Sequence, residues 1–288
     1  LLTMALALAD LASDDAAVRA KAATALGGRL QPELRGPLAR MAAEDSDPTA
    51  REAARIALAR TEFRLQMLGW AETLFFGLSL GSVLILAAIG LAVTFGVMGV
   101  INMAHGELMM LGAYTTWLVQ QWLPVNWSLP VAVSLAFLVA ALVGIAIERG
   151  IIRFLYGRPL ETLLATFGVS LILQQAVRSI FSPLNRSVAT PDWMSGTILL
   201  GPLEVTLNRL VIVGFCIAVF ALLWLALQRT RLGLEVRAVA QNRAMARAMG
   251  VRSARVDALT FGLGSGIAGV AGVALSQLTN VGPNLGQS

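Results

Sequence analysis

The sequence has very few of the residues on which catalysis and metal binding usually depend. Its 288 residues include one histidine, His105, one lysine, Lys21, and one cysteine, Cys216. A single cysteine excludes an intramolecular disulfide and a CxxC metal site. Because Lys21 follows no glycine-rich phosphate loop, the chain has no P-loop for a nucleotide. We therefore predict no catalytic residues, no metal site and no cofactor on this chain.

Charged residues are scarce as well. They make up 14% of the chain, whereas soluble domains contain roughly 25%. Hydrophobic residues make up 57%, the mean hydropathy is +0.73, and arginine supplies nearly all of the basic side of a net charge of +5. This composition predicts an all-α fold, a polytopic bundle of transmembrane helices in a lipid bilayer.

Residues 1–66 differ from the rest and predict a small soluble helical domain. Residues 32 positions apart match in pairs: Leu6 with Leu38, Ala7 with Ala39, Asp15 with Asp47, Arg19 with Arg51, Ala22 with Ala54, Ala25 with Ala57, and Leu26 with Leu58. Asp15 and Asp47 are placed to cap the second helix of each unit, and Pro48 suits a first helical position. The pattern resembles HEAT-type repeats of stacked helix pairs.

This repeat domain is electrically balanced, with nine basic and nine acidic residues. Nucleic-acid binding is therefore not expected. Two interpretations stay open: a docking module for a partner protein, or an extension that only helps the protein to fold.

Residues 67–288 predict a membrane domain with six spans. The expected spans are 74–100, 107–122, 129–147, 162–177, 210–227 and 258–281. Gly77, Gly81 and Gly90 in the first span are expected to permit close helix contacts. The segment from Gly262 to Gly269 superficially resembles a dinucleotide-binding fingerprint, but in an apolar span it predicts a helix-packing face.

Arginines set the expected orientation. The loop 228–257 holds seven arginines, and residues 149, 153 and 158 add three more after the third span. Six alternating spans place both loops on one side, which the positive-inside rule makes the cytoplasm. The repeat domain would then lie in the bacterial periplasm. Arg178, Arg186 and Arg209 on the opposite side weaken this assignment but are fewer than the seven.

A polar break interrupts the apolar sequence after the first span, where Asn102, His105 and Glu107 occur within six positions. Polar groups at membrane depth are costly unless they are paired or face a cavity. Thr166, Ser170, Gln174 and Gln175 on the fourth span could join them. Two interpretations stay open for these residues: a substrate path that hydrogen-bonds a small polar solute, or interhelical hydrogen bonds and a helix cap that stabilise the bundle.

The arginine-rich loop predicts an amphipathic helix over residues 237–249, with Gly250 as its C-cap. Ala244 to Gly250, AMARAMG, resembles a degenerate coupling motif of ABC importers, with Ala244 in place of the usual glutamate and Ala246 and Gly250 kept. The resemblance implies that this helix, including Arg243 and Arg247, docks on a separate ATPase. The other interpretation is a solvated basic loop that only fixes topology.

Together with INMAHGELMMLGAY, this motif makes the chain from Leu74 onward resemble the permeases of the branched-chain amino acid ABC transporter family. TFGVSLILQQAVRSIF, SPLNRSVATPDWMSGTI and the helical N-terminal extension resemble the urea permeases among them. The resemblance implies a non-enzymatic inner-membrane subunit of a urea importer, with further membrane helices beyond Ser288. Its expected partners are ABC ATPase subunits, a second permease subunit and a periplasmic substrate-binding protein. A branched-chain amino acid permease, or a membrane scaffold or channel that uses no ATP, are the alternatives.

Overall fold

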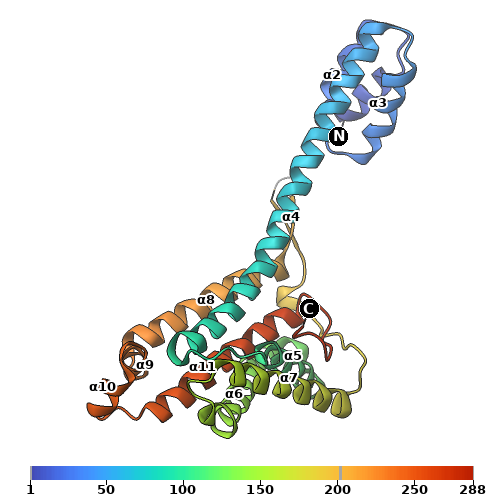
Figure 1. The fold of residues 1–288 in the computed structure, drawn as a ribbon. Helices are drawn as coiled ribbons and strands as arrows, with labels where there is room; N and C mark the ends of the chain where they lie inside the picture. The colour runs from blue at the N-terminus through green and yellow to red at the C-terminus, as the bar shows by residue number, and fades with distance from the viewer. Residues whose placement is uncertain (1, 201–202, 288) are drawn as a thin grey trace. The chain divides into compact units, whose positions relative to one another are not determined.

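The computed structural model describes residues 2–200 and 203–287, most of them in helices (Figure 1). The chain divides into two compact units, residues 1–75 with 199–205, and residues 76–198 with 206–288. The helices are α1 (Leu2–Asp10), α2 (Ala16–Leu26), α3 (Pro32–Glu44), α4 (Pro48–Met98), α5 (His105–Trp122), α6 (Val125–Gly150), α7 (Pro159–Phe181), α8 (Leu207–Arg229), α9 (Arg231–Gln241), α10 (Arg243–Ala248) and α11 (Ser253–Ser276). The 3-10 turns η1 (Ile152–Phe154) and η2 (Asp192–Met194) complete the helical elements.

The helices of the first unit begin where the sequence predicts. Asp15 Oδ1 accepts from the Ala17 amide at the start of α2, and Asp47 Oδ1 accepts from the Thr49 amide at the start of α4. Leu26 ends α2, and Gly28 follows with a φ of +81°. The buried core of this unit consists of Ala23, Leu26, Leu34, Leu38, Met41, Ala50, Ala54 and Ala57. Its likeness to HEAT repeats remains a prediction.

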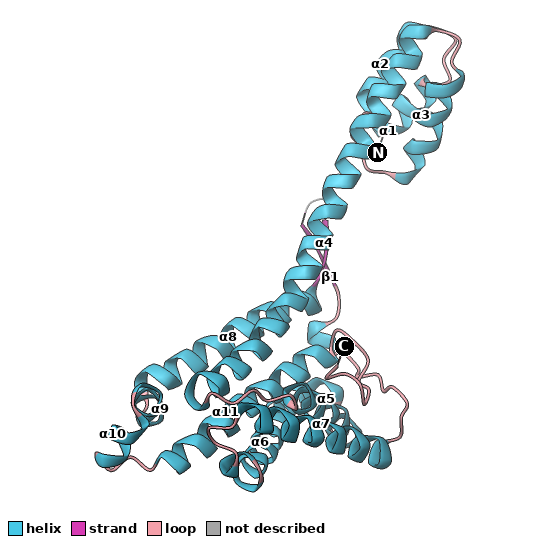
Figure 2. Cartoon of the chain, in the orientation of Figure 1, coloured by secondary structure: helices cyan, strands magenta, loops and turns pink. Residues whose placement is uncertain are grey.

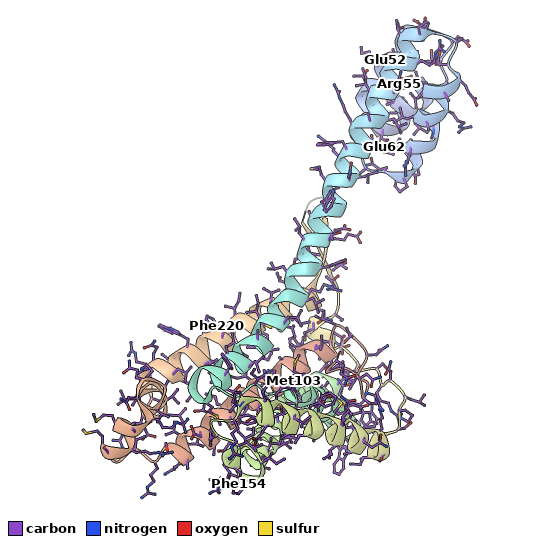
Figure 3. All side chains as sticks on the ribbon, in the orientation of Figure 1. Glu52, Arg55, Glu62, Met103, Phe154 and Phe220 are labelled. Atoms are coloured by element: carbon purple, nitrogen blue, oxygen red, sulfur yellow. The ribbon has the colours of Figure 1, made fainter. Side chains whose placement is uncertain are left out.

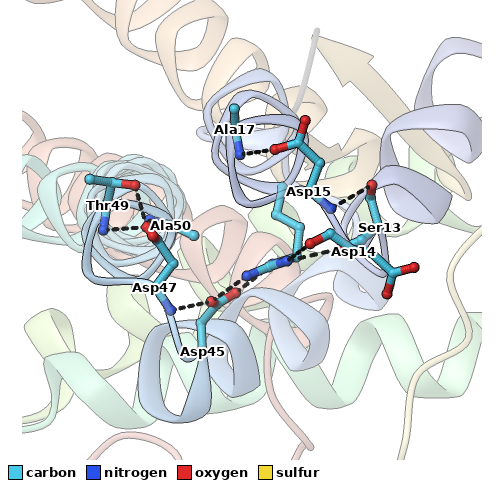
Figure 4. Close-up of polar contacts among 9 residues, drawn as sticks. Ser13, Asp14, Asp15, Ala17, Asp45, Asp47, Thr49 and Ala50 are labelled. Carbon is cyan, nitrogen blue, oxygen red and sulfur yellow. Dashed lines mark hydrogen bonds and ion pairs between the residues drawn. The ribbon is translucent and has the colours of Figure 1, made fainter.

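An ion pair that the sequence analysis missed joins the two turns of this unit (Figure 4). Arg19 Nε and Nη2 donate to the two carboxylate oxygens of Asp45 at 2.9 and 2.8 Å. Arg19 Nη1 also donates to the Ser13 carbonyl at 2.9 Å. The hydrogen bonds from Arg19, followed by one from the Asp47 amide, hold the pKa of Asp45 below its ordinary value. Arg19 on α2 therefore connects the turn before α2 to the turn after α3.

Acid is expected to loosen this unit through Asp45. A carboxylate with a lowered folded-state pKa stabilises the fold above its unfolded pKa, about 3.9, and the stabilisation is lost as the pH falls through the lowered value. In the Arg19→Gln variant, acid is expected to reduce the stability of this unit by less, because the pKa of Asp45 is then closer to its ordinary value in the folded state. Hydrogen exchange of α2 and α3 in the full chain between pH 7 and 3 tests this. Identical acid profiles for the two proteins would contradict it.

The predicted domain boundary at residue 66 falls inside α4, and the two units meet between residues 75 and 76. A helix can run through such a boundary because its hydrogen bonds are local.

The all-helical expectation also needs a correction. Two short strands, β1 (Thr197–Leu200) and β2 (Leu203–Thr206), form a hairpin drawn in magenta in Figure 2. In β2, the sequence LEVT alternates between apolar and polar residues, as is typical of a strand.

Five helices of the described chain are long and apolar enough to cross a membrane: α4, α6 with η1, α7, α8 and α11. The sequence predicted six, and α5 is absent from this set. The most apolar stretch of α11 is 89% buried, whereas those of the other four are 17–33% buried. The other four helices therefore keep broad apolar surfaces free for lipid, and α11 forms the centre of the bundle.

Glycines let the central helix pack closely, as predicted for Gly262 to Gly269. A Cβ on Gly264 would lie 2.5 Å from the Gly90 carbonyl oxygen, and a Cβ on Gly112 would overlap the carbonyl oxygen of Gly269. The expectation for Gly77 and Gly81 was wrong within the described chain. A Cβ at either position has no neighbour within 4 Å. Small residues alone do not reveal which face of a helix a neighbour occupies.

Candidate functional site

The predicted polar break is a non-helical segment between α4 and α5. Gly99 follows α4 with a φ of +66°, residues 99–104 are not helical, and α5 begins at His105. His105 Nε2 lies 2.9 Å from the carbonyl oxygen of Ala87. Ala87 precedes the end of α4 at Met98 by eleven residues, or about 16 Å of helix. The chain therefore turns back along α4 before α5 begins, and α5 starts at membrane depth.

α5 is 18 residues long, or about 27 Å of helix. Its sequence, HGELMMLGAYTTWLVQQW, is less apolar than those of the five helices named above, because polar residues occur at both of its ends. Discontinuous helices whose N-termini lie at mid-membrane are typical of substrate sites in secondary transporters.

Two of the predicted path residues support the non-helical backbone. The Met103 amide donates to Thr166 Oγ1 at 3.1 Å, and this hydroxyl lies 3.4 Å from the Ile101 carbonyl oxygen. The Ala104 amide donates to Asn102 Oδ1 at 3.0 Å. Irregular backbone at membrane depth needs such partners because no water is available from lipid. Asn102 and Thr166 thus stabilise the local backbone, and their part in a substrate path stays a prediction.

Glu107 forms a buried polar cluster with α7. Its side chain is in the first turn of α5 and the residue is 1% exposed. Ser170 Oγ and Gln174 Nε2 donate to Glu107 Oε1 at 2.8 and 2.7 Å, and Gln174 Nε2 lies 3.2 Å from Ser170 Oγ. Glu107 Oε2 has no hydrogen-bond partner within the described chain. The cluster thus offers a free acceptor beside the positive end of a helix dipole.

The structure brings Asn102, Glu107, Thr166, Ser170 and Gln174 to one face between α5 and α7. His105 contacts α4 instead, as its two-residue offset from Glu107 predicts. Gln175 is exposed and takes no part. The described residues include no group of three or more potential metal-ligating side chains.

The arginine-rich loop contains two helices and not the single helix predicted over 237–249. Asn242 is extended, with φ −152° and ψ 98°, and separates α9 from α10. Its Oδ1 accepts from the Met245 amide at 3.0 Å, so the chain starts a new helix there. Gly250, with a φ of +88°, ends α10 as expected, and the Val251 amide donates to the Ala246 carbonyl.

Arg243 turns inward from this loop. Its Nη1 and Nη2 donate to the Asp257 carboxylate at 2.7 and 2.9 Å, and the Asp257 side chain is 1% exposed. The Arg243 guanidinium lies 5.0 Å from the centre of the Tyr156 ring, whose hydroxyl donates to Glu148 at 3.2 Å. Burial, with the nearby charges of Asp257 and Glu148, raises the pKa of Tyr156 well above its ordinary range.

This network joins the loop after α6 to the loop between α8 and α11, which confirms that the two lie at one end of the bundle. The sequence analysis missed Glu148, Tyr156 and Asp257. The sequence does indicate that Asp257 needs a partner, because it is an acidic residue that directly precedes a long apolar run. The other predicted coupling residues lie nearby: Ala246 is buried, Ala244, Arg247 and Gly250 are exposed, and Arg247 Nε donates to Ser253 at 2.7 Å.

The sequence profile of one family, described as "Branched-chain amino acid transport system / permease component", matches residues 73–288. The chain is 32% identical over 229 residues to the high-affinity branched-chain amino acid transport system permease protein LivH of Salmonella typhimurium and to LivH of Escherichia coli. These matches cover 75% of this chain and 73% of each relative. BraD of Pseudomonas aeruginosa is 33% identical over 225 residues, which are 73% of this chain and 72% of the relative.

No solved structure matches the chain at a comparable level of significance. The matched region begins next to Leu74, where the sequence resemblance also begins, and it contains the non-helical residues 99–104, the polar cluster and α10. From residue 73 onward, this chain belongs to the family of permease components of branched-chain amino acid transport systems.

Proposed function

We propose that the chain is the membrane-spanning subunit of an ATP-driven importer in a bacterial inner membrane, and that the substrate passes the Glu107 cluster. The observation that carries this proposal is the start of α5 at membrane depth with an unpartnered carboxylate oxygen in its first turn. An uncompensated acceptor inside an apolar bundle is costly to maintain. A solute with N–H groups would donate a hydrogen bond to Glu107 Oε2 as it moves through the bundle.

Two substrates have such donors. A branched-chain amino acid has an ammonium group, and the similarity to the branched-chain amino acid permeases LivH and BraD favours it. Urea has two amide groups, and the N-terminal extension outside the matched family region favours it, together with the sequence resemblance described above. Both would use the same cluster, since Ser170 and Gln174 add neutral hydrogen-bonding groups to the carboxylate.

The energy would come from a separate ATPase that docks on α10. Met245 on α10 and Met249 directly after it are both more than half exposed. Exposed methionines suit an adaptable apolar contact with a partner protein. A second permease subunit and a periplasmic substrate-binding protein would complete the importer, with the N-terminal unit in the periplasm.

Uptake of labelled leucine and labelled urea by cells that express the complete transport operon tests the proposal, with and without ATP depletion. We expect ATP-dependent uptake of one of the two. Uptake insensitive to ATP depletion would instead favour a channel. Association of the chain with a partner, without uptake of either solute, would favour a scaffold.

Motion of α10 is expected to reach the bundle through Arg243 and Asp257. Arg243→Glu leaves Asp257 buried without its cation, so the free energy of unfolding should fall by about 3 kcal/mol. This value is the lower end of the range for a broken buried ion pair, because Arg243 is partly exposed. The double variant Arg243→Glu/Asp257→Arg should recover both thermal stability and uptake. Arg231→Glu, at an exposed position at the start of α9, is the matched control. Full uptake by the single Arg243 variant would contradict this role.

A further inference from the structure

A basic pocket lies at the end of the bundle where α6 ends and α11 begins. Its volume is about 440 Å³. Five of its lining residues are arginines, Arg149, Arg153, Arg247, Arg252 and Arg255. They come from three separate places in the sequence: the end of α6, the turn η1, and the junction between α10 and α11. Their convergence on one pocket is more specific than a general excess of arginine at a membrane surface.

The positive charge of this pocket is largely uncompensated. Arg149, Arg153, Arg252 and Arg255 form no ion pair with any residue that the structure describes, and Arg247 donates to the neutral Ser253. Two acidic residues also line the pocket. Asp257 is neutralised by Arg243, which leaves only Glu148 against five arginines. Like charges gathered in this way repel one another unless an anion lies between them.

The position of the pocket indicates the kind of anion. α6 ends at Gly150 and α11 begins at Ser253, so the pocket lies where two membrane-spanning helices leave the apolar layer. Large apolar side chains are exposed next to it in the sequence. Phe154 is 70% exposed and Leu160 is 82% exposed, and Figure 3 shows Phe154 at the edge of the bundle. A molecule with a phosphate group and apolar chains fits both surfaces.

We infer that this pocket binds the head group of an anionic phospholipid, with its phosphate among the arginines and its acyl chains along the apolar surface near Phe154. Basic pockets between membrane helices are suited to such head groups, and arginine pairs well with phosphate oxygens. The occupied pocket would hold the ends of α6 and α11 together. It lies beside the Arg243 and Asp257 pair, so the lipid would also stiffen the joint with α10.

The test uses the full chain purified in an uncharged detergent. Native mass spectrometry measures retained lipid, and thermal unfolding is followed after addition of phosphatidylglycerol or phosphatidylcholine. The variant Arg149→Gln/Arg255→Gln removes two charges from the pocket. The matched control, Arg229→Gln/Arg231→Gln, removes two exposed charges from the same loop region outside the pocket.

We expect phosphatidylglycerol to be retained and to raise the unfolding temperature, and phosphatidylcholine to have little effect. The pocket variant should bind phosphatidylglycerol about thirtyfold more weakly, because each arginine near an anionic head group contributes on the order of fivefold. The control should bind like the original chain. Equal binding of the two lipids, equal weakening in both variants, or stabilisation reproduced by inorganic phosphate alone would overturn the inference. Loss of a copurifying ATPase without any change in lipid retention would also overturn it, in favour of a protein-docking surface.

Discussion

Substrate uptake is expected to fall by about tenfold to a hundredfold when Glu107 is replaced by glutamine. The substitution keeps the size of the side chain but removes the charge, and a hydrogen bond to a charged group contributes about 1.5–3 kcal/mol. Ser170 and Gln174 would keep an oxygen acceptor at Oε1, so the bundle should still fold. Initial uptake rates, together with the amount of folded protein in the membrane, separate a transport effect from a folding effect.

Two neighbouring glutamines on α7 provide the control for this prediction. Gln174 donates to Glu107, whereas Gln175 is exposed. Gln174→Ala is expected to reduce uptake severalfold, since a neutral donor to a buried carboxylate is lost, and Gln175→Ala should leave it unchanged. Normal uptake in both Glu107→Gln and Gln174→Ala would remove the cluster from the substrate path. It would then be a structural hydrogen-bond network only.

Replacement of Gly112 by alanine is expected to unpack the bundle. The new methyl group would overlap the carbonyl oxygen of Gly269 on α11, and backbone on a central helix cannot rotate away as a side chain can. Overpacking of this kind costs about 1–3 kcal/mol and more where both sides are backbone. Thermal unfolding of the purified chain should therefore begin at a clearly lower temperature.

Gly168 on α7 is the matched control, because a Cβ there would have no neighbour within 4 Å in the described chain. Alanine is favoured over glycine in a helix by about 1 kcal/mol. Gly168→Ala should therefore be neutral or stabilising, opposite in sign to Gly112→Ala. Equal effects of the two substitutions would contradict the close packing of α5 on α11.

Patterns of apolar residues and caps were enough to predict most of the helices. Asp15, Asp47 and Gly250 mark helix ends in both sequence and structure because capping is a local interaction. The polar residues of the candidate site were also predicted, since ionisable groups at membrane depth are rare enough to be noticed. The sequence also indicated that polar residues of the fourth span, which is α7, could join them, but the pairs of atoms that form hydrogen bonds depend on how the helices pack.

Features that depend on distant contacts could not be read from the chain. The partner of Arg243 is fourteen residues away on another helix, and Arg19 and Asp45 are separated by 26 residues. The non-helical path of residues 99–104 depends on Thr166, more than sixty residues later. The sequence suggested a second span beginning near Glu107 because apolar residues resume there. It contained no local signal for the depth at which that helix begins.

α7 is synthesised after the segment that it stabilises, and this order affects how the segment inserts into the membrane. Residues 99–122 are too polar to enter a bilayer easily as an independent unit, since each charged or unpaired group adds to the cost of insertion. The hydroxyl and amide partners in α7 leave the ribosome only after α6 has been synthesised. The translocon must therefore hold α4, residues 99–122 and α6 together until α7 emerges, so that insertion of this region proceeds as one cooperative event and not helix by helix.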